Sequence, residues 1–143
     1  MSIIHFLNVL NGDCSIIQHA SGHVTAIDVN KAKTETTEDL IRRLAEISTK
    51  SYDGSISGNF NQKKYPVNPI EYLKKHNINS VFRFLLTHPD MDHMGGIKDF
   101  FAEFNPINFW DTENNEEKDN FNDAGPYNEE DWKFYKNLRD KNP

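Results

Sequence analysis

The chain has 143 residues, a hydrophobic content of 36% and a formal net charge of −6 at pH 7. This length suits one domain spanning residues 1–143, and the composition is apolar enough for a small packed core, which argues against a disordered chain. The charge is uneven, because residues 1–110 carry 12 acidic and 11 basic side chains whereas residues 111–143 carry 10 and 5. The acidic last quarter repels phosphate backbones, so this chain alone is a poor candidate for non-specific nucleic-acid binding.

The cysteine count and the N-terminal sequence indicate the compartment. Cys14 is the single cysteine, so the sequence permits no intrachain disulfide and no Cys-rich zinc knuckle. Residues 1–13 lack the basic, apolar and small-residue regions of a signal peptide, and no apolar stretch is long enough to span a bilayer. We therefore expect a cytoplasmic protein without membrane association.

The first 30 residues are predicted to form three strands of an antiparallel meander. The strands are expected at residues 3–9, 14–19 and 23–29, which are rich in β-branched and aromatic side chains. Asn11-Gly12 and Ser21-Gly22 are predicted to be tight turns between them, because glycine and asparagine tolerate positive φ.

Residues 34–50 are predicted to form the first helix. Thr36 or Thr37 can cap it, and Glu38 and Asp39 suit the positive end of its dipole. Apolar residues then recur at helical spacing and predict one buried stripe. This stripe consists of Leu40, Ile41, Leu44 and Ile47.

Strands and helices alternate in the rest of the chain, after a polar stretch at residues 51–66 that is predicted to be a surface loop. A short helix is expected after Pro69, with Ile70 and Leu73 facing inward. The continuous apolar run at residues 78–88 predicts a strand that is covered on both faces. The later elements are predicted to be a helix at 97–104, a strand at 107–111, a loop at 112–127 and a helix at 128–141.

The last helix has Asn128 as its predicted cap and Trp132, Tyr135 and Leu138 as its apolar face. Helices interleaved with strands after an opening meander are typical of a layered α/β domain. Five aromatic residues are predicted to be core, with part of their surface facing a further layer of the fold. They are Phe100, Phe101, Phe104, Phe109 and Trp110.

One short segment carries the candidate chemistry. "THPDMDHMGG", residues 87–96, places His88, Asp90, Asp92 and His93 within six positions at a predicted strand-to-helix junction. Imidazole nitrogen and carboxylate oxygen are ligands that Zn²⁺, Mn²⁺ and Fe²⁺ share. The alternative is a solvated polar loop, but four potential ligands within six positions, with Gly95-Gly96 shortly after them, favour a metal site.

The remaining nucleophiles and histidines are predicted to be structural. His5, His19, His23 and His76 fall in strands, a hairpin or a helix end, and His19 and His23 could pair on an ion across the Ser-Gly turn only as a minor alternative. Cys14 has no histidine base at a recognisable spacing, so an inert, partly buried thiol is expected.

The metal segment resembles the T-H-x-H-x-D-H-x-G-G signature of the metallo-β-lactamase fold. Aspartate at the second ligand position resembles the branch that includes the C-terminal domain of bacterial competence (DNA-uptake) channel proteins. "FLNVLNGDCSIIQ" (residues 6–18) is similar to the opening F-x-x-V-G-Q-G-D-x-x-x-I of that branch, and "AIDVN" (residues 26–30) to its I-D-x-G strand end. The resemblance covers residues 3 to about 111.

The resemblance implies a role for each matching residue. His88 and Asp90 would bind a first metal, and Asp92 and His93 a second. Asp28 would hold the metal loop in place without being a ligand, and Asp92 would also orient the bridging water and relay its proton. The implied cofactor is one or two Zn²⁺ ions, with Mn²⁺ or iron as alternatives because Asp90 replaces the commoner histidine.

The chain departs from this family pattern at several positions. Leu10-Asn11 stands where the family has Gly-Gln, and Asn30 replaces a glycine after Asp28. The family completes its site with later histidines and a bridging aspartate, but no histidine follows His93. The fold implied is therefore α/β, the N-terminal half of a metallo-β-lactamase αββα sandwich, with a mixed sheet and flanking helices.

Three functions stay open at this point. The first is a metal-dependent hydrolase that cleaves an ester or phosphodiester in the complete protein by a metal-bound hydroxide. The second is a non-catalytic half-domain that binds metal weakly or acts through a partner. The third and least favoured is a di-iron redox protein. The expected partners are a small-molecule or phosphodiester substrate, and the missing half-domain or a second chain.

Overall fold

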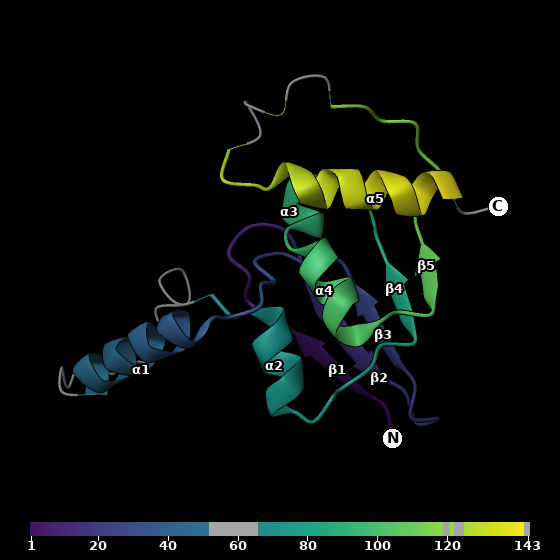
Figure 1. The fold of residues 1–143 in the computed structure, drawn as a ribbon. Coiled ribbons are helices and arrows are strands. Elements are labelled where there is room, and N and C mark those ends of the chain that lie inside the picture. Colours follow the sequence, from purple (N-terminus) through teal and green to yellow (C-terminus); the bar gives the residue numbers. More distant parts are fainter. Residues whose placement is uncertain (52–65, 119–120, 122–124, 142–143) are drawn as a thin grey trace.

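The computed structural model describes residues 1–51, 66–118, 121 and 125–141, and within them it has a five-stranded mixed sheet (Figure 1). In spatial order the strands are β1 (Ile3–Phe6), β2 (Ser15–Gln18), β3 (Val24–Ile27), β4 (Arg83–Leu85) and β5 (Asn108–Trp110). The first three strands are antiparallel, and β4 and β5 continue the sheet in parallel to β3. The predicted meander and α/β class are therefore confirmed.

The described helices connect and follow these strands. They are α1 (Thr37–Ser51), α2 (Pro69–Lys75), α3 (Met91–Met94), α4 (Ile97–Phe104) and α5 (Glu129–Lys141). Asparagine caps two of them, because the side chain of Asn68 accepts from the backbone N–H of Ile70 at 3.1 Å and that of Asn128 from Glu130 at 3.0 Å. The helices predicted after Pro69, at 97–104 and at 128–141 are confirmed.

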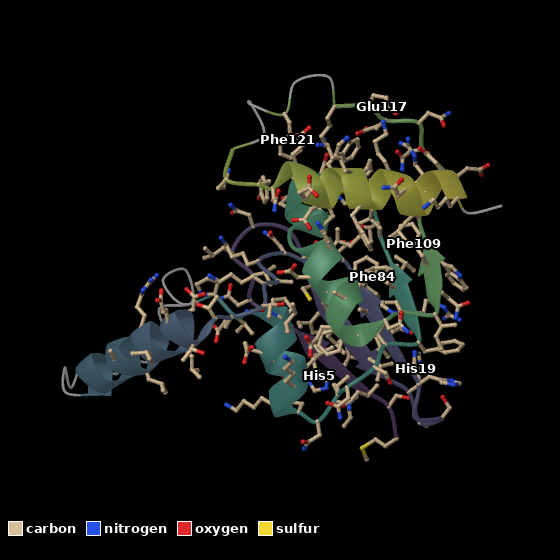
Figure 2. The ribbon with its side chains drawn as sticks, in the orientation of Figure 1. His5, His19, Phe84, Phe109, Glu117 and Phe121 are labelled. Carbon is tan, nitrogen blue, oxygen red and sulfur yellow. The ribbon has the colours of Figure 1, made fainter. Side chains whose placement is uncertain are left out.

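The core lies between the helices and one face of the sheet. One row of paired residues across the five strands faces the helices. It consists of His5, Ile16, Ala26, Phe84 and Phe109. Phe84 is fully buried, and its ring contacts those of Phe100 and Phe101 on α4 at centroid distances of 5.6 and 5.2 Å. Figure 2 shows Phe84 beside α4 and His5 beside α2.

Several residues that the sequence predicted to be core are buried in the structure. Ile70 and Leu73 of α2 face inward, and Trp132 and Tyr135 of α5 are buried, as predicted. The predicted aromatic core is confirmed for Phe100, Phe101, Phe104 and Phe109, which are buried or pack against buried residues.

The opposite face of the sheet is apolar but largely uncovered. Phe6, Ile4 and Trp110 keep 81%, 55% and 51% of their surface exposed, and Ile27 and Leu85 between them are half-buried. The prediction that the apolar run at 78–88 is covered on both faces is therefore wrong. Phe84 and Leu86 are buried under the helices, whereas Leu85 points to the face on which the described helices do not lie.

The predicted buried stripe on the first helix is also wrong. Leu40, Ile41 and Leu44 are 40%, 62% and 57% exposed, because α1 projects away from the sheet (Figure 1). Helical spacing identifies the apolar face of a helix, but it does not say what covers that face. The side chain of Ile47 and most of the predicted loop at 51–66 lie outside the described residues.

The turn between β1 and β2 is wider than the predicted tight turn at Asn11-Gly12. Eight residues, 7–14, separate the two strands, and we call them the β1–β2 loop. Gly12 has φ of 73°, and a Cβ there would lie only 1.7 Å from the backbone oxygen of Asp92. The loop leaves the sheet because it packs against the segment that carries Asp92. The Ser21-Gly22 turn is confirmed, with Gly22 at φ of 89°.

Candidate metal centre

The candidate site lies where β3 and β4 end. Because the two strands are parallel, their carboxyl ends meet at the same edge of the sheet, which is where open α/β sheets bind ligands. Asp28 directly follows β3, and its backbone N–H donates to the carbonyl of Leu85 at 2.9 Å. The N–H of Val29 donates to the carbonyl of His93, also at 2.9 Å, which holds α3 against this edge.

Asp28 is a buried carboxylate that accepts three hydrogen bonds. The backbone N–H of Thr87 donates to its Oδ1 at 2.7 Å, and the Thr87 hydroxyl donates to its Oδ2 at 2.6 Å. Nδ1 of His93 is 2.9 Å from the same Oδ2. Only 1% of Asp28 is exposed, so these protein donors replace water around the carboxylate.

This network fixes the tautomers of both histidines. A carboxylate only accepts, so Nδ1 of His93 is the protonated nitrogen and the lone pair of its Nε2 remains free. The one proton of the Thr87 hydroxyl goes to Asp28, so at 2.8 Å this oxygen accepts from Nδ1 of His88. His88 therefore also presents an unprotonated Nε2, which is the form of imidazole that binds a metal.

Three side chains form a group that could hold a metal ion. Ligand atoms of Asp13, Asp28 and His93 all lie within 4.8 Å of one another, with Asp13 exposed and the other two buried. Asp13 comes from the β1–β2 loop, which Gly12 lets approach α3. A carboxylate and an imidazole suit a divalent cation such as Zn²⁺, so the donor set fits the ion that the sequence implies.

The four predicted ligands are brought together only in part. The rings of His88 and His93 face each other with 3.9 Å between centroids, and Oδ1 of Asp92 lies 3.8 Å from Nε2 of His93. Asp90 is exposed and its carboxylate makes no capping hydrogen bond, although it occupies the N-cap position of α3. Asp13 is not among the residues predicted from the sequence. The sequence feature that could have identified it is the Gly12-Asp13 pair in the opening motif.

The two positions that depart from the family pattern also shape the site. Leu10 has φ of 72°, the left-handed conformation that favours glycine, and glycine is the residue at this place in the motif that the chain resembles. Asn30 does not adopt positive φ, which its neighbours Asp28 and Lys31 do. Its side-chain amide instead donates to the carbonyl of Asn11 at 2.6 Å and ties the β1–β2 loop to the end of β3.

Cys14 and Tyr127 border the site. Burial and the nearby charges of Asp28 and Asp13 raise the pKa of the Cys14 thiol to about 12, so it stays protonated and unreactive, as predicted. The pKa of Tyr127 is raised by burial and by the charge of Asp92, while a hydrogen bond with Asn30 lowers it. Tyr127, which stands just before α5, thus lies close to Asp92 and Asn30.

The other histidines have structural partners. Both ring nitrogens of His5 are hydrogen-bonded, to Tyr72 and Gln18 at 2.9 and 3.0 Å. His19 bonds the Thr25 hydroxyl at 2.9 Å, and His23 stacks on Phe82 with 4.2 Å between centroids. His76 bonds the carbonyl of Tyr72 at 2.8 Å. These contacts agree with the structural roles predicted for all four.

Comparison with known proteins adds no family assignment. The sequence matches no protein-family model, and no curated protein matches it at a significant level. Within the described residues, no helix is both long and apolar enough to cross a membrane.

Proposed function

We propose that this chain is the metal-binding half of a metallo-β-lactamase-like αββα sandwich, and that the complete domain is a metal-dependent hydrolase of esters or phosphodiesters. The observation that carries the proposal is the network of Asp28 and Thr87, which leaves Nε2 of both His88 and His93 free at the carboxyl ends of two parallel strands. A solvated loop has no need of a buried carboxylate that fixes two imidazole tautomers.

The proposed roles follow from this geometry. His88 and His93 would hold the ion through Nε2, and Asp13 would add a carboxylate from the β1–β2 loop. Asp28 orients the imidazole of His93 directly and that of His88 through the Thr87 hydroxyl. A bound Zn²⁺ would polarise the bond under attack and make water a nucleophile at neutral pH. Asp92 is half-buried beside Nε2 of His93, so its carboxylate is placed to orient that water and to accept its proton.

The uncovered face of the sheet supports the half-sandwich. Its exposed apolar residues, including Phe6 and Trp110, form the kind of surface that normally packs on another layer. The guanidinium of Arg83 lies 3.9 Å from the Trp110 ring centroid on this face, and its Nε is buried without a hydrogen-bond partner among the described residues. A second layer would bury the apolar groups and offer an acceptor to Arg83.

A second candidate is a metal-binding half-domain that does not catalyse. It is favoured by the small number of ligands around the site in the described residues. Of the proposed ligands, only Asp13 and His93 belong to the group whose ligand atoms lie within 4.8 Å of one another, so His88 would have to join them on binding. Two-metal hydrolysis needs further ligands from elsewhere.

Metal titration of the purified chain tests the proposal. Chelator-treated protein is titrated with Zn²⁺, Mn²⁺ and Fe²⁺ in a calorimeter, and the bound stoichiometry is checked by native mass spectrometry. We expect binding that His88→Ala and His93→Ala abolish and that the exposed His23→Ala leaves unchanged. Binding that survives both site variants, or no binding by the wild-type chain, would contradict the proposal. Hydrolysis of bis(p-nitrophenyl) phosphate by the complete protein then separates the enzyme from the non-catalytic half-domain.

A further inference from the structure

Asp131 makes an unusual contact for a residue of the acidic C-terminal segment. It lies on α5 with only 7% of its surface exposed. Its Oδ2 accepts from the backbone N–H of Gly96 at 2.9 Å, and its Oδ1 accepts from that of Lys98 at 3.1 Å. These are N-terminal groups of α4, which have no partner inside the helix. Gly96 has no side chain to cap them, so a residue 35 positions later in the chain does so.

The turn that Asp131 contacts directly follows the metal-binding segment. Gly95-Gly96 joins α3, which carries Asp92 and His93, to α4. Its other side is packed against the chain after β3, because a Cβ on Gly95 would lie 2.3 Å from Oδ1 of Asn30 and one on Gly96 would lie 1.8 Å from the carbonyl oxygen of Ala32. The turn is therefore held from two sides, by residues 30–32 and by Asp131.

Burial of the Asp131 carboxylate disfavours its charged form. Loss of hydration raises the pKa of Asp131 even though its two backbone hydrogen bonds lower it. The neighbouring acid Glu130 lies at the surface, where it pairs with the ammonium of Lys98 at 3.1 Å. Two adjacent acids thus contact the start of α4, one through buried backbone groups and the other through an exposed ion pair.

We propose that Asp131 is a positioning residue of the metal centre. By fixing the Gly95-Gly96 turn from α5, its carboxylate keeps α3 at the edge of the sheet and so keeps His93 in contact with Asp28. Tyr127 lies near the same turn, since it lines one pocket together with Asn30, Gly95, Gly96 and Asp131. This inference rests on the proposed function for the metal itself, but the positioning of His93 can be measured without metal.

The test compares Asp131→Ala and Asp131→Asn with Glu130→Gln as the matched control. In the metal-free protein, the Nδ1 proton of His93 is followed by NMR, because its hydrogen bond to Asp28 gives a slowly exchanging downfield signal. We expect this signal to be lost or broadened in Asp131→Ala, weakened in Asp131→Asn, which keeps one acceptor, and unchanged in Glu130→Gln. Zinc affinity is expected to fall by about tenfold or more in Asp131→Ala, in the range seen when groups behind metal ligands are removed.

The outcomes separate the two claims. If the Asp131 variants keep the His93 signal of the wild type, the positioning role is wrong, whether or not zinc binds. If the signal is lost in a variant that circular dichroism shows to be folded, the role is supported, and Asp131→Asn serves this purpose where Asp131→Ala unfolds. Failure of the wild-type chain to bind zinc would overturn the proposed function and leave the NMR result to decide the role of Asp131.

Discussion

Replacing Asp28 by asparagine is expected to reverse the tautomer that would make His93 a ligand in the proposed metal site. Asparagine is nearly isosteric and tolerates the φ of 55° that Asp28 adopts, so the backbone is preserved. Its amide carbonyl can still accept from the N–H of Thr87, but its NH₂ group then faces Nδ1 of His93. That nitrogen must become an acceptor, so the proton moves to Nε2 and the free lone pair is lost.

The expected magnitude follows from the hydrogen bonds that change. Two of the three donors to Asp28, the Thr87 hydroxyl and Nδ1 of His93, lose a charged acceptor. Each such bond contributes about 1.5–3 kcal/mol, and both groups can partly rearrange, so we expect a loss of about 2–4 kcal/mol in the free energy of unfolding. Zinc affinity is expected to fall about 10–100-fold, because the replaced group orients a metal ligand.

Urea unfolding followed by tryptophan fluorescence, in the presence of chelator, measures the first quantity, and calorimetric zinc titration measures the second. Asp13→Asn is the matched control, since Asp13 is exposed and belongs to the same group. It is expected to weaken zinc binding while changing stability by no more than about 0.5 kcal/mol. An Asp28→Asn variant with wild-type stability and wild-type zinc affinity would refute the role given to the Asp28 network.

Three further predictions address the loop, the thiol and the core. Leu10→Gly is expected to raise the unfolding free energy by about 1 kcal/mol in urea titration, because glycine adopts the φ of 72° without strain; a destabilised variant would contradict this. Burial raises the pKa of Cys14 from 9.0 to about 12, so the folded state binds this proton more tightly than the unfolded state. The free energy of unfolding is therefore expected to fall as the pH rises from 9.0 towards 12, by at most about 4 kcal/mol. Cys14→Ser, which does not titrate in this range, is expected to lose less unfolding free energy as the pH rises. Equal slopes of unfolding free energy against pH in the two proteins would contradict the raised pKa of the buried thiol. Phe84→Ala is expected to lower the free energy of unfolding in urea by about 3–5 kcal/mol, because the ring is fully buried among aromatic neighbours. A decrease below about 1 kcal/mol would mean that Phe84 does not lie in the core.

Local patterns were sufficient to predict the elements that hold the site. The β-rich runs and the Ser21-Gly22 turn predicted the meander, and Pro69 and the cap Asn128 predicted the starts of α2 and α5. The close spacing of His88, Asp90, Asp92 and His93 identified the loop that the structure places at the edge of the sheet, although Asp90 points to solvent there. Each of these signals lies within a few residues of the feature it predicts.

What the sequence did not predict depends on contacts between distant segments. The exposure of Leu40, Ile41 and Leu44 depends on where α1 lies relative to the sheet, which its own spacing does not determine. Asp13 joins the candidate metal group only because Gly12 packs against the carbonyl of Asp92, some 80 positions later in the chain. Asp131 was one acid among many in a charged segment, and only its burial against Gly96 distinguishes it.

The most direct test of the metal centre is ¹⁵N NMR of the histidine rings during zinc titration of the chelator-treated chain. We expect Nε2 of His88 and of His93 to change chemical shift on binding, while Nδ1 of both rings stays protonated and the rings of His19 and His23 are unaffected. Zinc-dependent shifts confined to the other histidines, or coordination through Nδ1 of His93, would contradict the proposed metal site.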